Sequence, residues 1–348
     1  MPPAAHAPPA RILIVRLSAL GDLVFATSLL DGLKQAWPMA EVDWLVQPEF
    51  ADFLRSQPAI ARVHCWDRKA WAGLWRGRRY RELWRTMAAF RRALRARDYD
   101  WVIDAQGLAK SRLLAWLAGG RRRIGYRSKE PLGFLLHERI ARPVEPRPYT
   151  GKQIAGEHRA LVEYLSGVPG AAPRLASLPL ADSGARPAVI ALAPFTTRPQ
   201  KHWPERHWAE LLRQLVARGE RPQLLGGPAD RAAADRILLA SGVAAQIDDQ
   251  VGRTRLPEAA AAIASARAVI GVDTGLTHMG VACDRPTVAI FGSTVPYRSG
   301  ARAPLEVLWL GLDCSPCKRK PTCGGAYTCL VDIGPAQVLA ALDRVLAA

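Results

Sequence analysis

Short apolar runs alternate along the chain with segments in which hydrophobic residues recur every three or four positions. In the first half, runs rich in β-branched and aromatic residues predict five strands, at 11–15, 41–46, 61–66, 100–105 and 123–126. A helical pattern follows the first strand and ends at Pro38, because proline cannot continue a helix. Strands that alternate with helices predict parallel sheets joined by crossover helices.

The same pattern restarts in the second half. It predicts strands at 188–194, 222–227, 245–249, 268–273 and 286–292, and helices at 204–219, 228–241, 256–266 and 275–283. Gly, Pro, Ala and Ser dominate 166–187, which is typical of a linker. We therefore expect an α/β protein of two doubly wound domains, 11–165 and 188–348, that present their loops to one shared cleft. We expect residues 1–10 to form a disordered leader, and the last helix to pack back on the body or on the N-terminal domain.

The length and the net charge of the chain limit which classes of protein and partner are compatible with it. The 348 residues suffice for two domains, and the longest apolar runs are far shorter than the roughly 18 residues that span a bilayer. The first ten residues lack the pattern of a signal peptide, so we expect a soluble, cytoplasmic protein. The net charge of +17 is concentrated in the first half, at 75–97 and 119–129. Such charge suits nucleic acid, an anionic membrane surface or a phosphorylated substrate, or simply marks solvated helix faces.

The first strand leads into VRLSALGDLVFATSLL, at 15–30, which resembles a phosphate-binding turn. The turn holds only Gly21, followed by the acidic Asp22 at the helix start, where a phosphate would otherwise bind. A dinucleotide-binding G-x-G-x-x-G does not follow this strand, which disfavours a dehydrogenase. Asp22 is either a helix cap or a base that faces a hydroxyl group.

Two loops of the second half suit an anionic ligand. In 193–208, Thr196, Thr197 and Lys201 offer hydroxyls, amides and a positive charge for a phosphate, although an ordinary strand-to-helix connection is the alternative. In 271–282, a strand runs through Asp273, Thr274 and Gly275 directly into a helix, whose free amides and dipole can receive a pyrophosphate.

Three side chains near these loops have two interpretations each. Asp273 accepts hydrogen bonds from sugar hydroxyls or caps its helix, because alongside the phosphates it would repel them. His278 donates to the sugar or phosphate, or is structural. Asp230, after the paired glycines of 224–237, binds the two ribose hydroxyls or is a plain N-terminal helix acid.

The six cysteines fall into two groups. Cys65 and Cys283 lie in apolar stretches and are expected to be buried. Cys314, Cys317, Cys323 and Cys329 have the spacing C-x2-C-x5-C-x5-C, which in a reducing cytosol favours a structural tetrathiolate site for zinc, or else iron, over disulfides or free thiols. The triplet Asp98-Tyr99-Asp100 is interpreted as a cap and turn and not as a metal site, since it precedes a strand.

Four segments together resemble one family. RILIVRLSALGDLVFATSLLDGLKQAWP, DYDWVIDAQGLAKS, TTRPQKHWPERHW and GVDTGLTHMGVACDRPTVAIFGSTVP are similar to the ADP-heptose:lipopolysaccharide heptosyltransferases of glycosyltransferase family 9, and more to heptosyltransferase I. The resemblance covers nearly the whole chain. The four-cysteine segment departs from typical heptosyltransferase I, which leaves the exact acceptor open.

The resemblance implies a GT-B fold of two Rossmann-like domains, with the acceptor on the first and the sugar nucleotide on the second. It implies inversion at the anomeric carbon with no cofactor or metal in catalysis, and Asp22 as general base. The nucleotide-sugar contacts that it implies are Thr196, Thr197, Lys201, Asp230, Asp273, Thr274, Gly275, Leu276 and His278. Lys201 would also stabilise the leaving diphosphate.

The implied acceptor is the inner-core precursor of lipopolysaccharide, a lipid-linked polyanion with acidic Kdo sugars. Its anionic groups would meet Arg68, Lys69, Arg121, Arg122, Arg123 and Arg127, and the enzyme would sit on the cytoplasmic face of the inner membrane. Trp66, Trp71, Trp75 and Trp84 either contact the membrane surface or are buried.

Two alternatives remain. One is a family 9 transferase for another sugar nucleotide or acceptor, including protein. The other is a non-catalytic polyanion-binding protein, although signatures of nucleic-acid-binding folds are missing and nucleic acid is not an expected partner.

Overall fold

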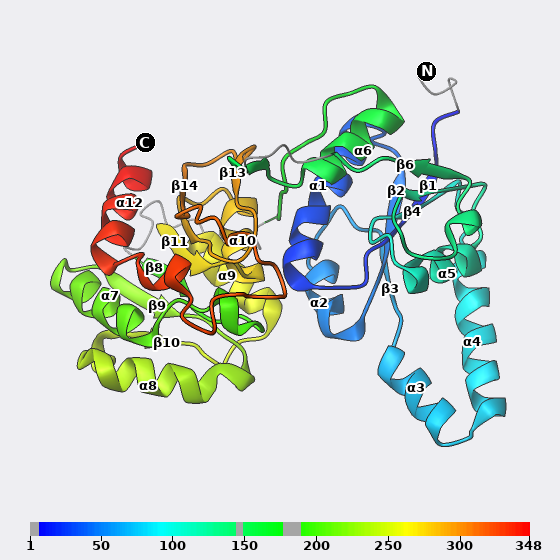
Figure 1. Cartoon of the computed structure of the whole chain (residues 1–348). Helices are drawn as coiled ribbons and strands as arrows, with labels where there is room; N and C mark the ends of the chain where they lie inside the picture. The colour runs from blue at the N-terminus through cyan, green and yellow to red at the C-terminus, as the bar shows by residue number, and fades with distance from the viewer. Residues whose placement is uncertain (1–6, 144–148, 177–188) are drawn as a thin grey trace. The chain divides into compact units, whose positions relative to one another are not determined.

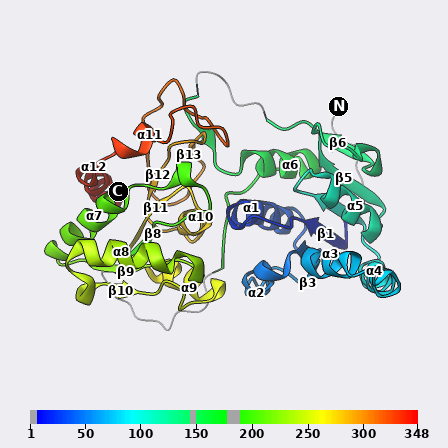
Figure 2. The same ribbon diagram turned by 60° about the horizontal axis from the view of Figure 1, so that its bottom comes forward.

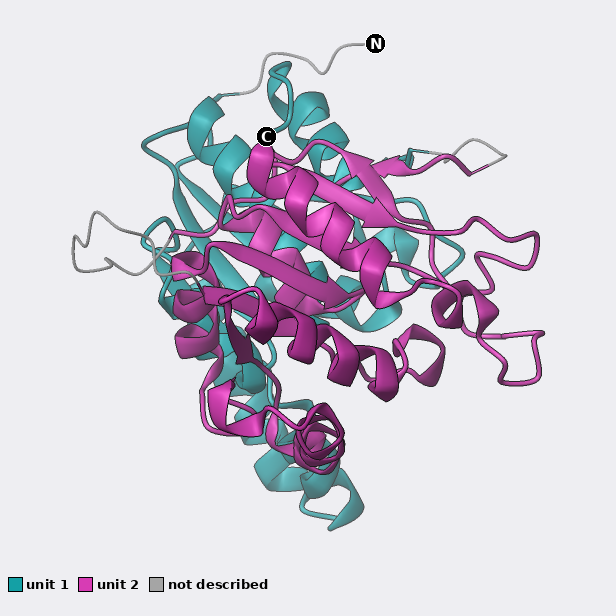
Figure 3. Ribbon diagram, turned by 90° about the vertical axis from the view of Figure 1, so that its left-hand side faces the viewer, with its two compact units in different colours: residues 1–144, 155–171 teal, residues 145–154, 172–348 magenta. Residues whose placement is uncertain are grey.

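The computed structural model describes residues 7–143, 149–176 and 189–348, which divide into two compact units (Figure 3). Unit 1 comprises residues 1–144 and 155–171, and unit 2 comprises residues 145–154 and 172–348. From the sequence, 11–165 was expected to form one domain. In the division into compact units, 145–154 belongs to unit 2 and the helix that follows belongs to unit 1.

Unit 1 is built on a six-stranded sheet whose strand pairs are all parallel (Figure 1). The order is β3-β2-β1-β4-β5-β6. Its strands are β1 (Arg11–Val15), β2 (Glu41–Val46), β3 (Arg62–Cys65), β4 (Trp101–Asp104), β5 (Arg122–Tyr126) and β6 (Glu138–Ile140). Its helices are α1 (Leu20–Ala36), α2 (Ala51–Arg55), α3 (Arg68–Arg76), α4 (Tyr80–Arg95), α5 (Ala109–Ala118) and α6 (Gly156–Ser166), with short 3-10 turns at Pro48–Phe50 and Gly133–Leu135.

Unit 2 repeats this plan with the order β10-β9-β8-β11-β12-β14, again parallel. Its strands are β8 (Val189–Ala193), β9 (Arg221–Leu224), β10 (Asp248–Asp249), β11 (Ala268–Val272), β12 (Thr287–Ile290) and β14 (Leu305–Leu308). Its helices are α7 (Glu205–Ala217), α8 (Arg231–Ser241), α9 (Leu256–Ser265), α10 (Gly275–Ala282), α11 (Thr328–Val331) and α12 (Pro335–Ala347), with 3-10 turns at Pro199–Lys201, Pro228–Asp230 and Ala244–Gln246. The predicted α/β class with two doubly wound parallel sheets is confirmed.

A small two-stranded sheet joins distant parts of unit 2. β7 (Lys152–Gln153) pairs in parallel with β13 (Tyr297–Ser299), so that Lys152 lies opposite Tyr297. The helix after β7, α6, packs instead against α1 in unit 1 (Figure 2). There Gly32 leaves room for Val162, because a Cβ at position 32 would lie 2.7 Å from a Val162 methyl group.

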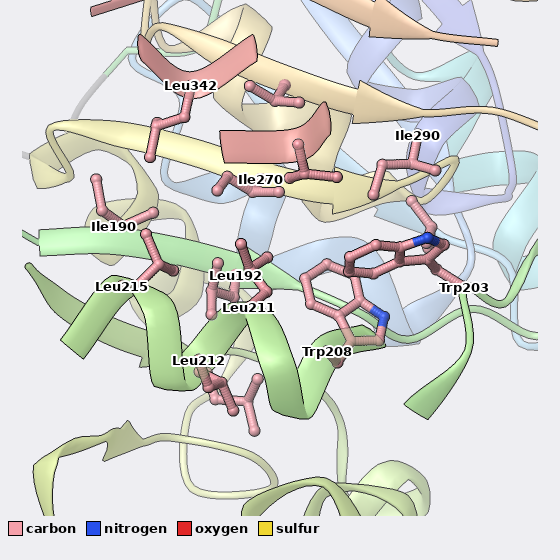
Figure 4. Close-up of a cluster of buried hydrophobic side chains, with 14 of the residues drawn as sticks. Ile190, Leu192, Trp203, Trp208, Leu211, Leu212, Leu215, Ile270, Ile290 and Leu342 are labelled. Carbon is pink, nitrogen blue, oxygen red and sulfur yellow. The ribbon is translucent and has the colours of Figure 1, made fainter. Parts of the chain in front are cut away.

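The core of unit 2 explains the position of the last helix. Trp203 and Trp208 pack edge to face, with ring centroids 4.9 Å apart, among leucines and isoleucines of β8, α7 and β11 (Figure 4). Leu342 and other apolar residues of α12 belong to this same cluster. The last helix therefore packs on the sheet of unit 2.

Two smaller expectations can be compared with the structure. In the 98–100 triplet, Asp100 Oδ2 accepts hydrogen bonds from the backbone amides of Ala10 and Arg11, so this carboxylate has structural partners. Residues 1–6 of the expected leader and 177–187 of the expected linker lie outside the described residues. In the part of the chain that the structure describes, we find no helix with both the length and the hydrophobicity to span a bilayer.

Candidate functional site

The turn between β1 and α1 presents Asp22 at the carboxyl edge of the sheet of unit 1. Asp22 is the third residue of α1, and its Oδ2 accepts a hydrogen bond from the Ala19 amide at 3.3 Å. The same oxygen lies 2.7 Å from Nη2 of Arg16, whose side chain is 7% exposed while that of Asp22 is 50% exposed. Asp22 therefore caps its helix and still shows half of its carboxylate to solvent.

Arg16 is a site residue that the sequence analysis missed. It directly follows β1, and its Nη1 donates to the backbone oxygen of Ala105, which follows β4, at 2.6 Å. Gln106 accepts a hydrogen bond from the Leu17 amide at 3.0 Å, which ties the same two loops together. A charged residue directly after an apolar strand was the signal available in the sequence. Arg16 thus fixes Asp22 relative to the sheet.

A buried histidine lies behind this turn. His158 of α6 is 1% exposed, and its Nδ1 is 2.8 Å from the hydroxyl of Tyr126, at the end of β5. Burial, reinforced by the positive charge of Arg16, lowers the pKa of His158 to about 3. His158 is therefore neutral at physiological pH, and it lies close enough to Arg16 and Asp22 for their charges to affect its pKa.

Some of the predicted acceptor residues lie at the same edge as Asp22. Arg68 and Lys69 begin α3, after β3, and Arg127 directly follows β5. Because the carboxyl ends of parallel strands share one edge of the sheet, these residues and Asp22 face the same side. Burial and the nearby charge of Arg68 lower the pKa of Lys110, at the start of α5, which the sequence analysis did not select.

The structure does not bring the other three arginines to that edge. Arg122 opens β5 and pairs in register with Trp101, the first residue of β4, so 121–123 lie at the amino ends of the strands. All three side chains have local partners there. Arg121 lies 3.4 Å from Asp100, Arg122 lies 2.7 Å from Glu138, and Arg123 Nε donates to the Leu135 oxygen at 2.7 Å. The run of arginines at 121–123 in the sequence did not indicate whether these residues lie at the amino or the carboxyl end of the strand.

In unit 2, three side chains converge on Asp273, which directly follows β11. Lys201 Nζ lies 2.5 Å from Oδ2 of Asp273, and the Thr294 hydroxyl donates to that same oxygen at 2.5 Å. His278 Nε2 lies 3.2 Å from Oδ1. The loops after β8, β11 and β12 each contribute to this cluster. Two of the predicted residues, Lys201 and His278, are thus brought together by the third.

The electrostatics of the cluster favour a charged Asp273. Burial alone would raise the pKa of Asp273, but the hydrogen bond from His278 and the charge of Lys201 hold it well below its usual range. His278 Nδ1 is also 2.8 Å from the hydroxyl of the buried Tyr297. When Nε2 donates to Asp273, Nδ1 accepts from Tyr297, so both ring nitrogens are used. Thr294 and Tyr297 were not singled out in the sequence, because only the fold places them beside Asp273.

The amino end of α10 lies beside this cluster. Thr274 is its N-cap residue, in extended conformation, and Gly275 is its first residue, so the expectation that Asp273 could cap the helix is wrong. The first amides of a helix have no acceptor within the helix and favour anions. Gly271 lets the helix start close to the sheet, because a Cβ there would lie 2.1 Å from Thr277 Oγ1 and 2.8 Å from the Ala193 Cβ.

The remaining predicted contacts lie in neighbouring loops of unit 2. The Thr196 backbone oxygen is 2.7 Å from His202 Nε2, and Thr197 is exposed between β8 and α7. Leu276 is half-buried in the first turn of α10. Asp230 accepts a hydrogen bond from the Gly227 amide at 2.8 Å and so caps its own turn. This contact occupies one carboxylate oxygen and leaves the ribose interpretation as a prediction.

The cysteine segment is joined to the same loops. The Lys318 amide donates to the Ser293 oxygen at 2.7 Å, and Gln200 Nε2 donates to the Lys318 oxygen at 2.8 Å. Ser293 and Gln200 directly precede Thr294 and Lys201, so the segment is held next to both partners of Asp273.

The predicted metal site is not supported. Over the described ranges, no group of three or more His, Cys, Asp and Glu side chains is arranged to hold a metal ion. Cys314 is exposed in a loop, Cys317 and Cys323 are partly exposed, and Cys329 is buried against the core of unit 2. All six cysteines are free thiols. Cys329, in α11, belongs to the hydrophobic core of unit 2, and its thiol still lies close enough to the other three cysteines for their charges to raise its pKa.

Comparisons with known proteins agree with this arrangement. The sequence profile of glycosyltransferase family 9 (heptosyltransferase) matches residues 87–327. The chain is 34% identical to lipopolysaccharide heptosyltransferase 1 of Pseudomonas aeruginosa over 334 residues, covering 90% of this chain and 87% of that protein. It is 28% identical to lipopolysaccharide heptosyltransferase 2 of Salmonella typhimurium over 359 residues, covering 97% of this chain and 98% of that protein.

A solved structure extends the similarity to three dimensions. Escherichia coli heptosyltransferase WaaC with ADP-2-deoxy-2-fluoro heptose superimposes with a TM-score of 0.73 at 28% identity, covering 96% of this chain and 99% of that one. The two parallel sheets therefore form the GT-B fold of such enzymes. With sequence, fold and profile in agreement, the chain belongs to glycosyltransferase family 9, the heptosyltransferase family, and is a glycosyltransferase.

Proposed function

We propose that the protein transfers a heptose from ADP-heptose to a hydroxyl group of the Kdo-containing inner core of lipopolysaccharide, with inversion and without a catalytic metal. The names of its relatives and the ADP-heptose analogue in the WaaC structure support the donor and the acceptor class. One observation carries the proposal: unit 1 presents a half-exposed carboxylate fixed by a buried guanidinium, while unit 2 presents a lysine and helix amides suited to a diphosphate.

The carboxylate of Asp22 acts as the general base. An inverting transfer is an in-line displacement, in which the acceptor oxygen forms a bond to the anomeric carbon as the bond to the diphosphate breaks. The hydroxyl becomes acidic as its new bond forms, so a carboxylate can accept the proton. The contacts of Asp22 to Arg16 and Ala19 both use Oδ2, which leaves Oδ1 to receive that proton.

The leaving ADP is stabilised by unit 2. Lys201 carries three N–H donors, and its contacts with the Asp273 carboxylate and backbone oxygen use at most two of them. The third donor and the first amides of α10, at Gly275 and Leu276, stabilise the negative charge that develops on the diphosphate. Thr196, Thr197 and Thr274 supply hydroxyls or amides to the phosphates, and Asp230 binds the ribose. His278 acts through Asp273, whose carboxylate it holds in place.

The acceptor binds on unit 1 through its negative charges. Arg68, Lys69 and Arg127 lie at the edge that carries Asp22, and Lys110 joins them near Arg68. Carboxylates and phosphates of the inner core pair with such side chains. An acceptor of this kind is lipid-linked, so the enzyme works in the cytoplasm at the inner face of the inner membrane.

Asp22→Asn tests the base, with Asp31→Asn in the same helix as the matched control. We expect Asp22→Asn to lower kcat by about 10²- to 10⁴-fold, the usual contribution of a general base, while the Kd for ADP changes less than about twofold. Asp31→Asn should retain wild-type turnover. Undiminished turnover in Asp22→Asn, or product with retained anomeric configuration by NMR, would contradict the proposed mechanism.

Lys201→Met tests the donor side, with the exposed Lys320→Met as its control. Loss of a charge-assisted hydrogen bond should weaken ADP binding by about 10- to 100-fold in calorimetry. Assays in EDTA should match those with added Mg²⁺. Turnover that requires the divalent ion would contradict the metal-independent step.

A further inference from the structure

The α3–α4 hairpin of unit 1 has a surface that the proposed mechanism does not use. All nine residues of α3 are at least partly exposed, and Leu94 is the one fully buried residue of the sixteen in α4. Figure 1 shows the two helices extending together beyond the edge of the sheet of unit 1. The hairpin therefore exposes most of its surface.

The inner face of the hairpin is already packed. Trp71 lies against Phe90 with ring centroids 5.4 Å apart and against Trp66 at 6.1 Å, and all three rings join the hydrophobic cluster of unit 1. These contacts hold the two helices on the domain. The exposed aromatic residues of the hairpin lie outside this hydrophobic cluster.

The tip carries three exposed aromatic side chains, Trp75, Tyr80 and Trp84, which we call the aromatic tip. They are 63%, 52% and 71% exposed, respectively. The rings of Trp75 and Tyr80 contact each other across the turn, with centroids 5.3 Å apart. Tyr80 and Trp84 are four residues apart in α4 and so share one helix face. Contiguous exposed aromatics of this kind mark an interaction surface.

Positive charge surrounds the aromatic tip. Residues 68–85 contain seven Lys and Arg against one acidic residue, Glu82, which is paired with Arg79. Arg76, Arg78, Arg81 and Arg85 flank the three aromatic residues and are exposed. Such an arrangement is complementary to a surface that is anionic outside and apolar beneath.

We propose that the aromatic tip and its flanking arginines dock on an anionic phospholipid bilayer. Tryptophan and tyrosine rings are favoured at the level of lipid headgroups, where the ring is half in an apolar environment and its polar atom remains hydrated. Arginines beside them gain from the negative surface potential of acidic lipids. The inference deepens the proposed function, since it rests on a lipid-linked acceptor, and it assigns the membrane contact to one hairpin.

Sedimentation with vesicles tests this docking. The full chain is mixed with vesicles of phosphatidylethanolamine and phosphatidylglycerol, and in parallel with vesicles of phosphatidylcholine alone. We expect binding to the anionic vesicles to fall at least about tenfold in Trp75→Ala/Trp84→Ala and similarly in Arg81→Glu/Arg85→Glu, because each variant removes one of the two attractions. Phe134→Ala and Leu239→Ala, which remove exposed apolar side chains outside the hairpin, serve as controls and should bind like wild type.

The outcomes separate docking from catalysis. Both hairpin variants should transfer heptose to a water-soluble acceptor lacking acyl chains at the wild-type rate, which also shows that they are folded. Wild-type vesicle binding by the tryptophan variant, an equal loss in the controls, or equal binding to the neutral vesicles would overturn the docking. If wild type binds single-stranded nucleic acid and not vesicles, and the tryptophan variant loses that binding, the aromatic tip would be assigned to nucleic acid instead. Failure of heptose transfer with intact vesicle binding would refute only the proposed reaction.

Discussion

Arg16 and Asp22 form an ion pair in which the guanidinium is almost wholly buried while the carboxylate is half-exposed, with Nη2 and Oδ2 2.7 Å apart. The buried partner is held in turn by the Ala105 oxygen, so it cannot follow the carboxylate into solvent. The pair orients Asp22 without covering it. A half-exposed carboxylate with a fixed direction is suited to receive a proton from a bound hydroxyl.

Substitution of Arg16 should separate orientation of Asp22 from donor binding. Arg16→Met removes the contact that fixes Asp22, and we expect kcat to fall by about 10- to 100-fold, since small displacements of a catalytic group have effects of that size. Arg16→Lys should recover part of the rate. Steady-state kinetics and ADP calorimetry measure the two effects. If ADP affinity falls together with kcat, Arg16 stabilises the whole protein and does not act on Asp22 alone.

Gly271→Ala should damage the donor site through packing alone. The added Cβ would lie 2.1 Å from Thr277 Oγ1, so the start of α10 must shift. Overpacking of this kind costs about 1 to 3 kcal/mol in the free energy of unfolding, and we expect ADP binding to weaken with it. Gly73→Ala in α3 is the matched control, because nothing lies within 4 Å of its Cβ position. Equal behaviour of the two variants in urea unfolding would refute this account.

His158 predicts an acid-sensitive N-terminal unit. The pKa of His158 in the folded protein is about 3, whereas an unfolded histidine has a pKa of about 6.5. Between these values only the unfolded chain binds the proton, so stability is full above pH 6.5 and falls as the pH decreases, by about 1.4 kcal/mol per pH unit from this group.

One substitution tests whether His158 causes the loss of stability at low pH. Hydrogen exchange of the β1 and β4 amides should show a smaller loss of stability between pH 7.5 and pH 5 in His158→Gln than in wild type, even though the variant is less stable at neutral pH. The same slope in both proteins would mean that another group controls the acid sensitivity.

The cysteines should differ in reactivity as free thiols do. Hydrogen bonds from the Tyr327 and Gly325 amides lower the pKa of Cys323, whereas burial raises the pKa of Cys329 to about 11 and that of Cys283 to about 12. Since the thiolate is the reactive form, brief alkylation at pH 7.5 should modify Cys323 well before Cys329 or Cys283, as read by peptide mass spectrometry. If Cys314, Cys317 and Cys323 were all protected from alkylation until a chelator was added, the cysteines would have to bind a metal ion, contrary to this account.

Periodicity was sufficient for the fold because buried parallel strands are continuous apolar runs. The ten predicted strands are all present, and most bounds agree within one or two residues, as in 268–273 against Ala268–Val272. The short strands β6, β7, β13 and β14 were not predicted. They lie at sheet edges or in a separate ribbon, where fewer positions need to be apolar and the periodic signal is weak.

The site was partly predictable for a similar reason. Lys201 and Asp273 lie in loops at strand ends, His278 lies one turn into the helix that follows Asp273, and the fold joins the three in one cluster. Arg16, Thr294 and Tyr297 could not be selected, because their importance comes from contacts between loops far apart in the sequence. Arg121 was predicted to bind the acceptor but lies at the amino ends of the strands, because charge alone does not indicate which end of a strand a residue occupies.

The β7–β13 ribbon limits how this enzyme can be dissected. A fragment that starts at residue 172 would lose β7, leaving the backbone of β13 with an unpaired edge that invites aggregation. Because the Tyr297 hydroxyl of β13 contacts His278, such a truncated half would also lose support for the histidine beside Asp273. Donor-binding fragments and chimeras of this protein should therefore carry 149–154 in addition to the contiguous C-terminal part.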